Sequence, residues 1–327
     1  MKAIIWTKYG LPNVLLLKEV EKPTPKNNEV LIKIYATAVT SGDCRLRGFK
    51  VPVGFWLPTR LIFGFIKPRK TIPGMDISGE IEAVGKDVKL FKKGDKIYGT
   101  TGIGLGANAQ YVSLCEKKAI VTKPINISYE EAASIPFGGL AAIYFLRDKA
   151  NIQSNQKILI NGASGAVGTA SIQLAKYYKA AVTGVCSTTN IELIKSLGAD
   201  KVIDYTKENF TNNGETYDVI LDTVGNLSLS SCKDSLKKQG KLILINAGLF
   251  ENLMSIGNDK IICGVASEKK DDLIFLKELL EAGYIKPVID RVYPLDKLVD
   301  AHKYVDKGHK KGNVAISVEH CLSSKST

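Results

Sequence analysis

The chain has 327 residues, of which 45% are hydrophobic, and a formal net charge of +12 at pH 7. This length exceeds what one hydrophobic core usually serves and suits two domains. No apolar run reaches the roughly 18 residues of a membrane-spanning helix, and the start lacks the apolar region of a secretion signal, so we expect a soluble, cytoplasmic protein. The basic residues are spread along the whole chain, which favours a lysine-rich surface over a nucleic-acid partner.

The first third of the chain contains short β-type runs that glycine and proline turns separate. These runs cover residues 3–9, 30–39, 77–85 and 96–101. Short apolar runs bounded by turn residues are typical of strands. The pattern therefore predicts a mostly β, partly open barrel.

From about Ser128 the pattern changes to alternating strands and helices. Ser128 and Glu131 have capping-box spacing in front of a largely apolar helix. The strands that follow are nearly all apolar, as expected when helices cover both faces of a parallel sheet. We therefore predict an α/β, doubly wound parallel sheet of about six strands. Its strands are expected at 157–162, 181–186, 201–205, 217–224, 240–246 and 260–265, with helices at 165–179, 189–197 and 227–237.

The elements after Val265 do not continue this alternation. They are a helix at 271–283, a strand at 288–295, a helix at 295–308 and a last strand at 313–318. We assign them to the first domain, which makes the parallel sheet an inserted domain. The cleft between two such domains is the natural place for a binding site.

A glycine turn connects the first strand of the predicted sheet to its helix. The sequence GASGAVG (162–168) fits the pattern G-x-G-x-x-G with Ala163 at the first position. Gly165 lacks a Cβ, so backbone can approach a pyrophosphate there, and Gly168 lets the helix lie close to the strand. The N–H groups at the helix start attract phosphate. We therefore expect a dinucleotide to bind through Ser164, Gly165, Ala166, Val167 and Gly168.

The end of the second sheet strand indicates which dinucleotide binds. NAD sites commonly place a carboxylate there, and it would repel the 2′-phosphate of NADPH. Here no carboxylate appears before Glu192, whereas Ser187, Thr188 and Asn190 offer neutral hydrogen bonds and Tyr205 ends the adjacent strand. This pattern predicts NADPH, although the loop holds no arginine or lysine. The alternative is that these polar residues only cap the following helix.

Cysteines and histidines form no metal-binding pattern. The six cysteines include no C-x-x-C pair and no cluster with zinc-binding spacing, which indicates reduced thiols. The three histidines at 302, 309 and 320 fall outside the predicted site segments. We expect them at the surface.

Five segments of the chain form a combined motif. They are PGMDISGEIEAVGKDVKLFKKGDKIYG (73–99), EEAASIPFGGLAAIYFL (130–146), NGASGAVG (161–168), SLGADKVIDY (196–205) and YDVILDTVG (217–225). Together they resemble the medium-chain dehydrogenase/reductase superfamily, and most closely its zinc-free quinone oxidoreductase branch. The resemblance covers essentially the whole chain. It implies a dinucleotide-binding Rossmann domain (125–267) inserted into a mostly β GroES-like catalytic domain (1–124 plus 268–327), and a homodimer. It also implies that four residues lie beside the nicotinamide, namely Thr223, Val224, Asn246 and Ala247.

The resemblance also bears on zinc. In members of the superfamily that oxidise alcohols, the zinc ligands stand at positions that match Thr40, Met75 and the neighbourhood of Phe137. These side chains do not supply the three ligands that zinc catalysis needs. We therefore expect no metal and a hydride transfer to quinones or α,β-unsaturated carbonyl compounds, because both delocalise the resulting charge. Thr40 is the candidate catalytic residue, with its hydroxyl on the acceptor oxygen. The alternative is a packing role at the strand end.

Two other functions stay open at this point. The chain could be an NADPH-binding protein without activity, similar to a lens crystallin or an RNA-binding relative. It could also be an enoyl-thioester reductase, in which Lys307, Lys310 and Lys311 would hold an acyl carrier.

The segment 48–70 mixes large apolar side chains with basic ones. Its glycines and prolines prevent one long helix. Three interpretations remain for it: a lid over a hydrophobic substrate pocket, a peripheral membrane contact through residues 49–67, or a packed loop or dimer contact.

Overall fold

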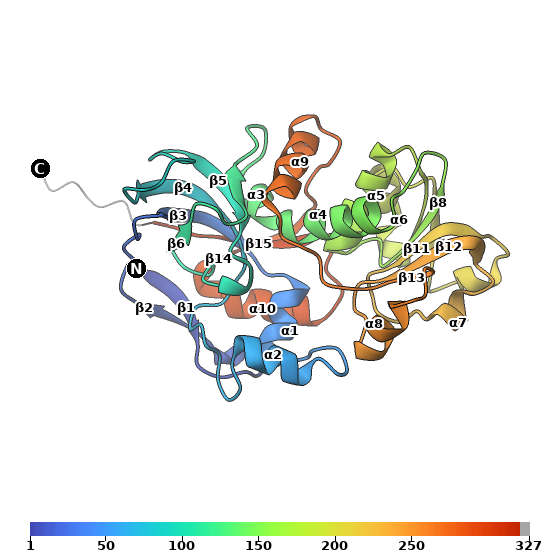
Figure 1. The fold of residues 1–327 in the computed structure, drawn as a ribbon, viewed down its shortest axis with the longest axis horizontal. Helices are drawn as coiled ribbons and strands as arrows, with labels where there is room; N and C mark the ends of the chain where they lie inside the picture. Colours follow the sequence, from blue (N-terminus) through green and yellow to red (C-terminus); the bar gives the residue numbers. More distant parts are fainter. Residues whose placement is uncertain (321–327) are drawn as a thin grey trace, which may run out of the picture.

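The computed structural model describes residues 1–320. Figure 1 shows two lobes, with the mostly antiparallel sheet of the N-terminal residues on the left and a parallel sheet flanked by helices on the right. The predicted fold class, a doubly wound parallel sheet inserted into a mostly β domain, is confirmed.

The parallel sheet has six strands in the order β10-β9-β8-β11-β12-β13, and every pair is parallel. The chain starts this sheet in the middle, at β8, and reverses direction between β8 and β11. In such sheets the crevice beyond the carboxyl ends of these two strands binds the ligand. The strands are β8 (Lys157–Asn161), β9 (Ala181–Cys186), β10 (Lys201–Asp204), β11 (Tyr217–Asp222), β12 (Leu236–Leu244) and β13 (Ile261–Ile262).

The helices around this sheet follow the predicted positions, with two differences. The predicted capping box is present: the Glu131 N–H donates to Ser128 Oγ over 3.1 Å and the Ser128 N–H donates to Glu131 Oε2 over 2.8 Å. The helix that it starts is interrupted at Pro136, which has no N–H to donate. The helix expected at 227–237 is only one turn, because the chain from Leu236 onwards joins β12. The helices are α3 (Tyr129–Ser134), α4 (Pro136–Ala142), the π-helix η3 (Ile143–Lys149), α5 (Ala166–Tyr177), α6 (Ile191–Ser196), α7 (Leu229–Cys232), α8 (Leu249–Ser255) and α9 (Lys270–Glu281).

The other domain is built on a seven-stranded sheet with a separate two-stranded sheet, β1–β2, beside it. Its last strand pairs antiparallel with the first long one, so that Ala315 lies opposite Ala38. The strands are β1 (Lys2–Trp6), β2 (Leu15–Glu19), β3 (Glu29–Ala38), β4 (Asp76–Val84), β5 (Lys96–Thr100), β6 (Tyr111–Cys115), β7 (Ile120–Thr122), β14 (Ile289–Pro294) and β15 (Asn313–Ser317). The chain therefore returns to its starting domain, as its sequence predicts.

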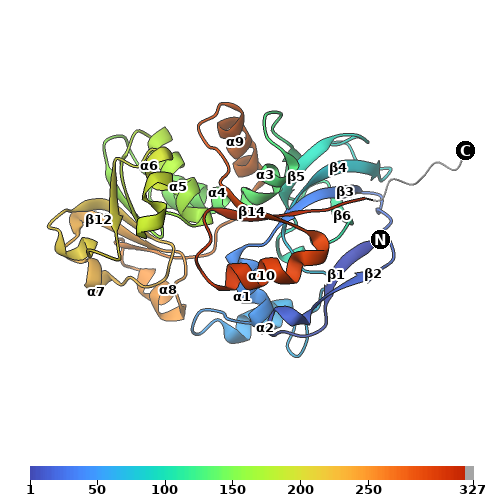
Figure 2. The same ribbon diagram turned by 180° about the vertical axis from the view of Figure 1, so that it is seen from behind.

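Three helices complete this domain, α1 (Ser41–Gly48), α2 (Trp56–Phe63) and α10 (Leu298–Asp306). Figure 2 shows α10, in red, next to α1, in blue, although about 250 residues separate them in the sequence. This contact places α10, from the C-terminal part of the chain, next to α1, which carries Arg45.

One apolar core connects the two lobes. Leucines of α9 lie in the same buried cluster as strand β8. Leu276 packs over Gly139 of α4, where an added Cβ would lie 2.6 Å from a Leu276 methyl carbon. The Tyr98 hydroxyl of β5 also donates to the Leu273 carbonyl over 2.7 Å. The helix α9 thus packs against both lobes, and the domain boundaries at 125 and 268 stay predictions.

The five described cysteines are free thiols, and Cys321 lies outside the described residues. Among residues 1–320, no helix has the length and apolarity that crossing a membrane requires.

Candidate functional site

A cleft of about 1230 Å³ lies at the carboxyl edge of the parallel sheet. The sheet contributes strand ends such as Asn161, Cys186 and Thr223, and the other domain contributes Arg45 and residues 308–311. The cleft lies where a doubly wound sheet is expected to bind its ligand. Its volume exceeds the range of about 300–1,000 Å³ that is typical of small-ligand sites, so it has room for a dinucleotide.

The glycine turn forms the floor of this cleft. The predicted Ser164, Gly165, Ala166 and Val167 all line it. Gly165 is the N-cap of α5 and gives the helix no side-chain cap, so N–H groups at the helix start are available to an anion.

Gly168 lies one turn further along and does not line the cleft. A Cβ there would lie 2.3 Å from the Gly162 carbonyl oxygen and 2.6 Å from that of Ala163. The close approach of α5 to the turn thus depends on this glycine. Both features fit the pyrophosphate of a dinucleotide.

The loop after β9 forms one end of the cleft. Ser187 and Asn190 line it, as predicted for the adenosine side. The Asn190 amide nitrogen donates to Ser187 Oγ over 3.3 Å, whereas its buried Oδ1 has no hydrogen-bond partner among the described residues. Such an orphaned polar atom is costly unless a ligand or water pairs with it.

The end of β10 and the loop after it lie beside the loop after β9, and Asp204, the last residue of β10, carries a carboxylate. Tyr205 lines the cleft as predicted, but the Thr188 hydroxyl points away and donates to Asp204. The Thr206 hydroxyl also donates to Asp204, over 2.7 Å. The bond from Thr188, followed by that from Thr206, lowers the pKa of Asp204 to about 2. Asp204 is therefore charged, and Lys207 Nζ lies 3.7 Å from it.

The ends of β11 and β12 form the opposite part of the site. Thr223 and Val224 line the cleft, but Asn246 and Ala247 do not. Asn246 instead lies behind them: its amide nitrogen donates to the Thr223 carbonyl over 3.0 Å, and its Oδ1 accepts from the Arg45 guanidinium. A residue of one domain thereby holds a cation of the other domain at the cleft.

Thr40 lies deeper, as the N-cap of α1. It is buried and does not line the cleft. Its hydroxyl donates to Asp43 Oδ2 over 2.6 Å and accepts from the Asp43 N–H over 3.1 Å. The only hydroxyl hydrogen of Thr40 is therefore engaged within its own helix. The catalytic role of Thr40 stays a prediction.

The three positions matched to zinc ligands do converge. Around Gly42, the place of an added Cβ is 3.3 Å from a ring carbon of Phe137, 3.3 Å from Thr40 Oγ1 and 3.6 Å from the methyl carbon of Met75. A hydroxyl, a thioether and a phenyl ring do not match the N, S and carboxylate donors that hold zinc. Nor do residues 1–320 contain a group of three or more His, Cys, Asp or Glu that could hold a metal ion.

Residues 308–311 also reach the cleft, although the sequence suggests Lys310 and Lys311 only as a site for an acyl carrier. They do so because the Gly312 N–H donates to the Ser164 carbonyl over 2.7 Å, which fixes this segment across the glycine turn. His309, Lys310 and Lys311 line the cleft as a result. Burial lowers the pKa of Lys310 to about 8. These residues are 140 positions away from the turn, so only tertiary structure brings them there.

His302 contradicts the expected surface position, whereas His309 is exposed as expected but belongs to the site. His309 lines the cleft, and His302 is 1% exposed in α10. His302 Nδ1 lies 3.2 Å from Cys44 Sγ and accepts from Arg47 Nε over 3.3 Å. Burial lowers the pKa of His302 to about 3, so it is neutral and helps to pack α10 against α1.

The fold and the cleft together define a nucleotide-dependent oxidoreductase of the alcohol-dehydrogenase type. Residues 26–125 match the family of the alcohol dehydrogenase GroES-like domain, and residues 197–316 match that of the zinc-binding dehydrogenases.

Individual relatives agree with these matches. The chain is 35% identical over 328 residues to 2-methylene-furan-3-one reductase of Solanum lycopersicum, covering 97% of this chain and 79% of that protein. It is 30% identical to the chloroplastic NADPH-dependent alkenal/one oxidoreductase of Arabidopsis thaliana, with the same shares of 97% and 79%. The structure of the quinone oxidoreductase from Coxiella burnetii matches with a TM-score of 0.86 at 28% identity, covering 98% of this chain and 99% of that one. The chain belongs to the medium-chain dehydrogenase/reductase family, in its quinone oxidoreductase branch.

Proposed function

We propose that the chain is an NADPH-dependent, zinc-independent oxidoreductase that transfers hydride to quinones or α,β-unsaturated carbonyl compounds. The observation that carries this proposal is the convergence, in one cleft, of the glycine turn and the guanidinium of Arg45. The names of the tomato and Arabidopsis relatives support an enone or enal as the acceptor.

NADPH is the dinucleotide that the adenosine end favours. No carboxylate ends β9, and the buried Oδ1 of Asn190 lacks a partner. The carboxylate of Asp204 accepts from two threonine hydroxyls, which leaves Ser187 and Tyr205 to receive a 2′-phosphate. Lys207, whose ammonium lies 3.7 Å from Asp204, lines the cleft beside them. A relative that is named for its NADPH dependence supports this choice.

Bound NADPH supplies the hydride, and the chain supplies orientation and charge. Its turn holds the pyrophosphate, and Thr223 and Val224 position the nicotinamide beside the acceptor. Arg45 forms no ion pair within residues 1–320, and Asn246 aims its guanidinium at the cleft. Burial lowers the pKa of Arg45, yet a guanidinium keeps its proton in proteins. Arg45 therefore stabilises the negative charge that develops on the acceptor oxygen.

A panel of acceptors tests this function. NADPH oxidation is followed by absorbance with a quinone, a short enal and an enoyl thioester, each with and without a zinc chelator, and NADH is compared as donor. We expect turnover with the quinone or the enal, no effect of the chelator, and a higher KM for NADH. Binding of NADPH without any turnover would support the non-enzymatic alternative, and turnover of the thioester alone would support the enoyl reductase.

The homodimer and the cytoplasmic location expected from the sequence stay proposals. Sedimentation velocity of the purified chain measures the first, and the location of the chain in its own cells measures the second.

A further inference from the structure

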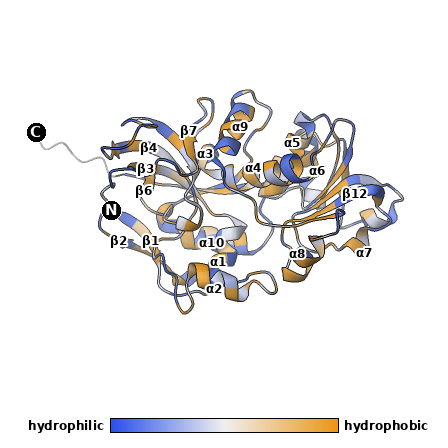
Figure 3. Ribbon diagram, in the orientation of Figure 1, coloured by the Kyte–Doolittle hydropathy of each residue, from blue (hydrophilic) through white to orange (hydrophobic). Residues whose placement is uncertain are grey.

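A group of large apolar side chains is exposed on one side of the molecule. On the α2 side, Phe65 is 56% exposed and Ile66 is 87% exposed. On the α8 side, Phe250 is 69% exposed and Ile256 is 79% exposed. Figure 3 shows hydrophobic stretches on both helices at the bottom of the molecule. Single exposed apolar residues are ordinary, but a contiguous group of this kind marks an interaction site.

These side chains form one surface although they belong to different domains. The Leu249 N–H of α8 donates to the Val53 carbonyl over 2.8 Å. An added Cβ on Gly54 would lie 2.4 Å from Leu249 Cβ, so the two segments are in direct contact. We call this surface, from residues 53–66 and 249–256, the α2–α8 face.

An internal arginine holds the α2 side in a fixed shape. The guanidinium carbon of Arg60 lies 3.7 Å from the centre of the Phe49 ring and 4.5 Å from that of Tyr9. Its Nη1 donates to the Phe65 carbonyl over 2.7 Å. This aromatic and hydrogen-bonded environment keeps the loop folded back while Phe65 and Ile66 point outward.

The charges around the α2 side are of one sign. Between Cys44 and Met75 the chain has no aspartate or glutamate, whereas Lys67, Arg69 and Lys70 are all exposed. On the α8 side, residues 249–256 contain one carboxylate, Glu251, and no lysine or arginine, so the positive charge lies on the α2 side.

Exposed apolar side chains beside basic ones are suited to contact with the surface of a membrane. Apolar side chains enter the boundary between headgroups and acyl chains, and lysine and arginine contact anionic headgroups. A second copy of this chain fits less well, because a two-fold contact would bring the basic residues of both copies together. We propose that the α2–α8 face docks on a bilayer surface that contains anionic lipid.

Flotation of the full chain with lipid vesicles tests this proposal. Vesicles of phosphatidylcholine alone are compared with vesicles that also contain phosphatidylglycerol, at low and high salt. We expect binding to the anionic vesicles that weakens with salt. Ile66→Ser should weaken it roughly tenfold or more, because the isoleucine loses its burial in the bilayer. Ile125→Ser is the matched control, since Ile125 is 90% exposed outside this face.

The basic residues require a separate pair of variants. The double variant Lys67→Gln, Lys70→Gln should lose roughly tenfold or more of its binding to anionic vesicles. The double variant Lys86→Gln, Lys93→Gln removes the same charge elsewhere and should bind like the unchanged chain.

Three results would overturn the proposal. The first is the absence of binding to anionic vesicles. The second is a change of oligomeric state by Ile66→Ser in sedimentation velocity, without vesicle binding, which would make the face a contact between copies. The third is a change in acceptor KM by Phe65→Ser with vesicle binding unaltered, which would make this segment a substrate lid.

Discussion

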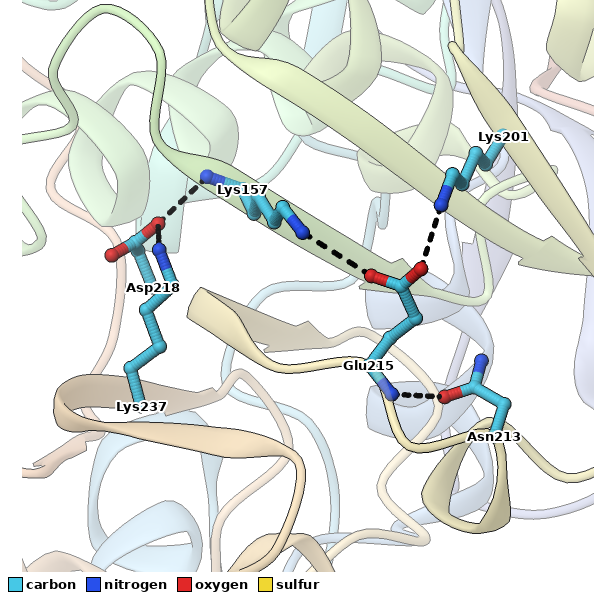
Figure 4. Close-up of polar contacts among 6 residues, drawn as sticks. All are labelled: Lys157, Lys201, Asn213, Glu215, Asp218 and Lys237. Carbon is cyan, nitrogen blue, oxygen red and sulfur yellow. Dashed lines mark hydrogen bonds and ion pairs between the residues drawn. The ribbon is translucent and has the colours of Figure 1, made fainter.

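Lysines at the two edges of the parallel sheet differ in whether a carboxylate lies beside them. At the amino edge, Lys157 and Lys201 lie 3.3 Å and 2.8 Å from the carboxylate of Glu215, and Lys237 lies 2.7 Å from that of Asp218 (Figure 4). Every one of these cations thus has an internal partner. Such exposed pairs contribute little stability, about 0–1 kcal/mol, but they place a carboxylate beside each of these three lysines.

Of the three lysines that line the cleft at the carboxyl edge, Lys207 pairs with Asp204. Arg45, Lys310 and Lys311 line the cleft and form no ion pair in the described part of the chain. Positive charge alone therefore does not mark a binding site in so basic a chain. The cations proposed to bind the ligand, Arg45, Lys310 and Lys311, are those that the fold holds in the cleft without an ion-pair partner among the described residues.

The largest effect is expected from a substitution that distorts the glycine turn at the carboxyl edge of the sheet. In Gly168→Ala the new methyl group meets the Gly162 carbonyl, so α5 must move away from the turn. We expect a loss of roughly 1–3 kcal/mol in the free energy of unfolding and no measurable NADPH binding by fluorescence titration. Gly104→Ala is the control, because nothing lies within 4 Å of its Cβ position. Normal NADPH binding by Gly168→Ala would contradict the assignment of the turn.

A smaller effect is expected from removing one free cation. Arg45→Met should lower kcat roughly 100-fold, as the loss of a charge-stabilising donor does, with little change in the Kd of NADPH. Lys201→Gln, at the amino edge, should leave both quantities unchanged. If Arg45→Met kept its full kcat while Thr40→Val lost activity, the hydroxyl and not the guanidinium would serve the acceptor oxygen.

The smallest effect concerns pH. Lys310 has a pKa of about 8, so its positive charge is present below that pH and is lost above it. Because phosphate favours the charged form, the Kd of NADPH should rise above pH 8, by at most about tenfold per pH unit. In Lys310→Gln this rise should disappear. A Kd that responds to pH equally in both proteins would show that Lys310 does not contact the coenzyme.

The sheet and the glycine turn could be predicted from the sequence because short, contiguous stretches of residues specify them. Strand β8, the GASGAVG turn and α5 are adjacent, and their apolar and glycine pattern is sufficient to predict them. The length of helix α7 was overestimated. Pairing with β11 extends strand β12 back to Leu236, although the residues there are mostly polar. Tertiary pairing overrides local preference in such cases.

The part of the site that faces the acceptor was less predictable, because residues distant in the sequence form it. Arg45 and Asn246 are 201 positions apart, and only the packing of two domains makes them partners. The role expected for Thr40 came from its position in a family pattern. That pattern placed Thr40 next to Met75 and Phe137 correctly, yet it could not show that Asp43 already uses the hydroxyl.

The hydrogen bond from Gly312 to Ser164 joins two segments that the ribosome synthesises at different times. The glycine turn, which forms the floor of the cleft, is synthesised about 140 residues before the strap of residues 308–312 that crosses it. A nascent chain that ends before this strap therefore has the turn without its lysines. The cleft takes its final form only once this strap has been synthesised and has crossed the turn.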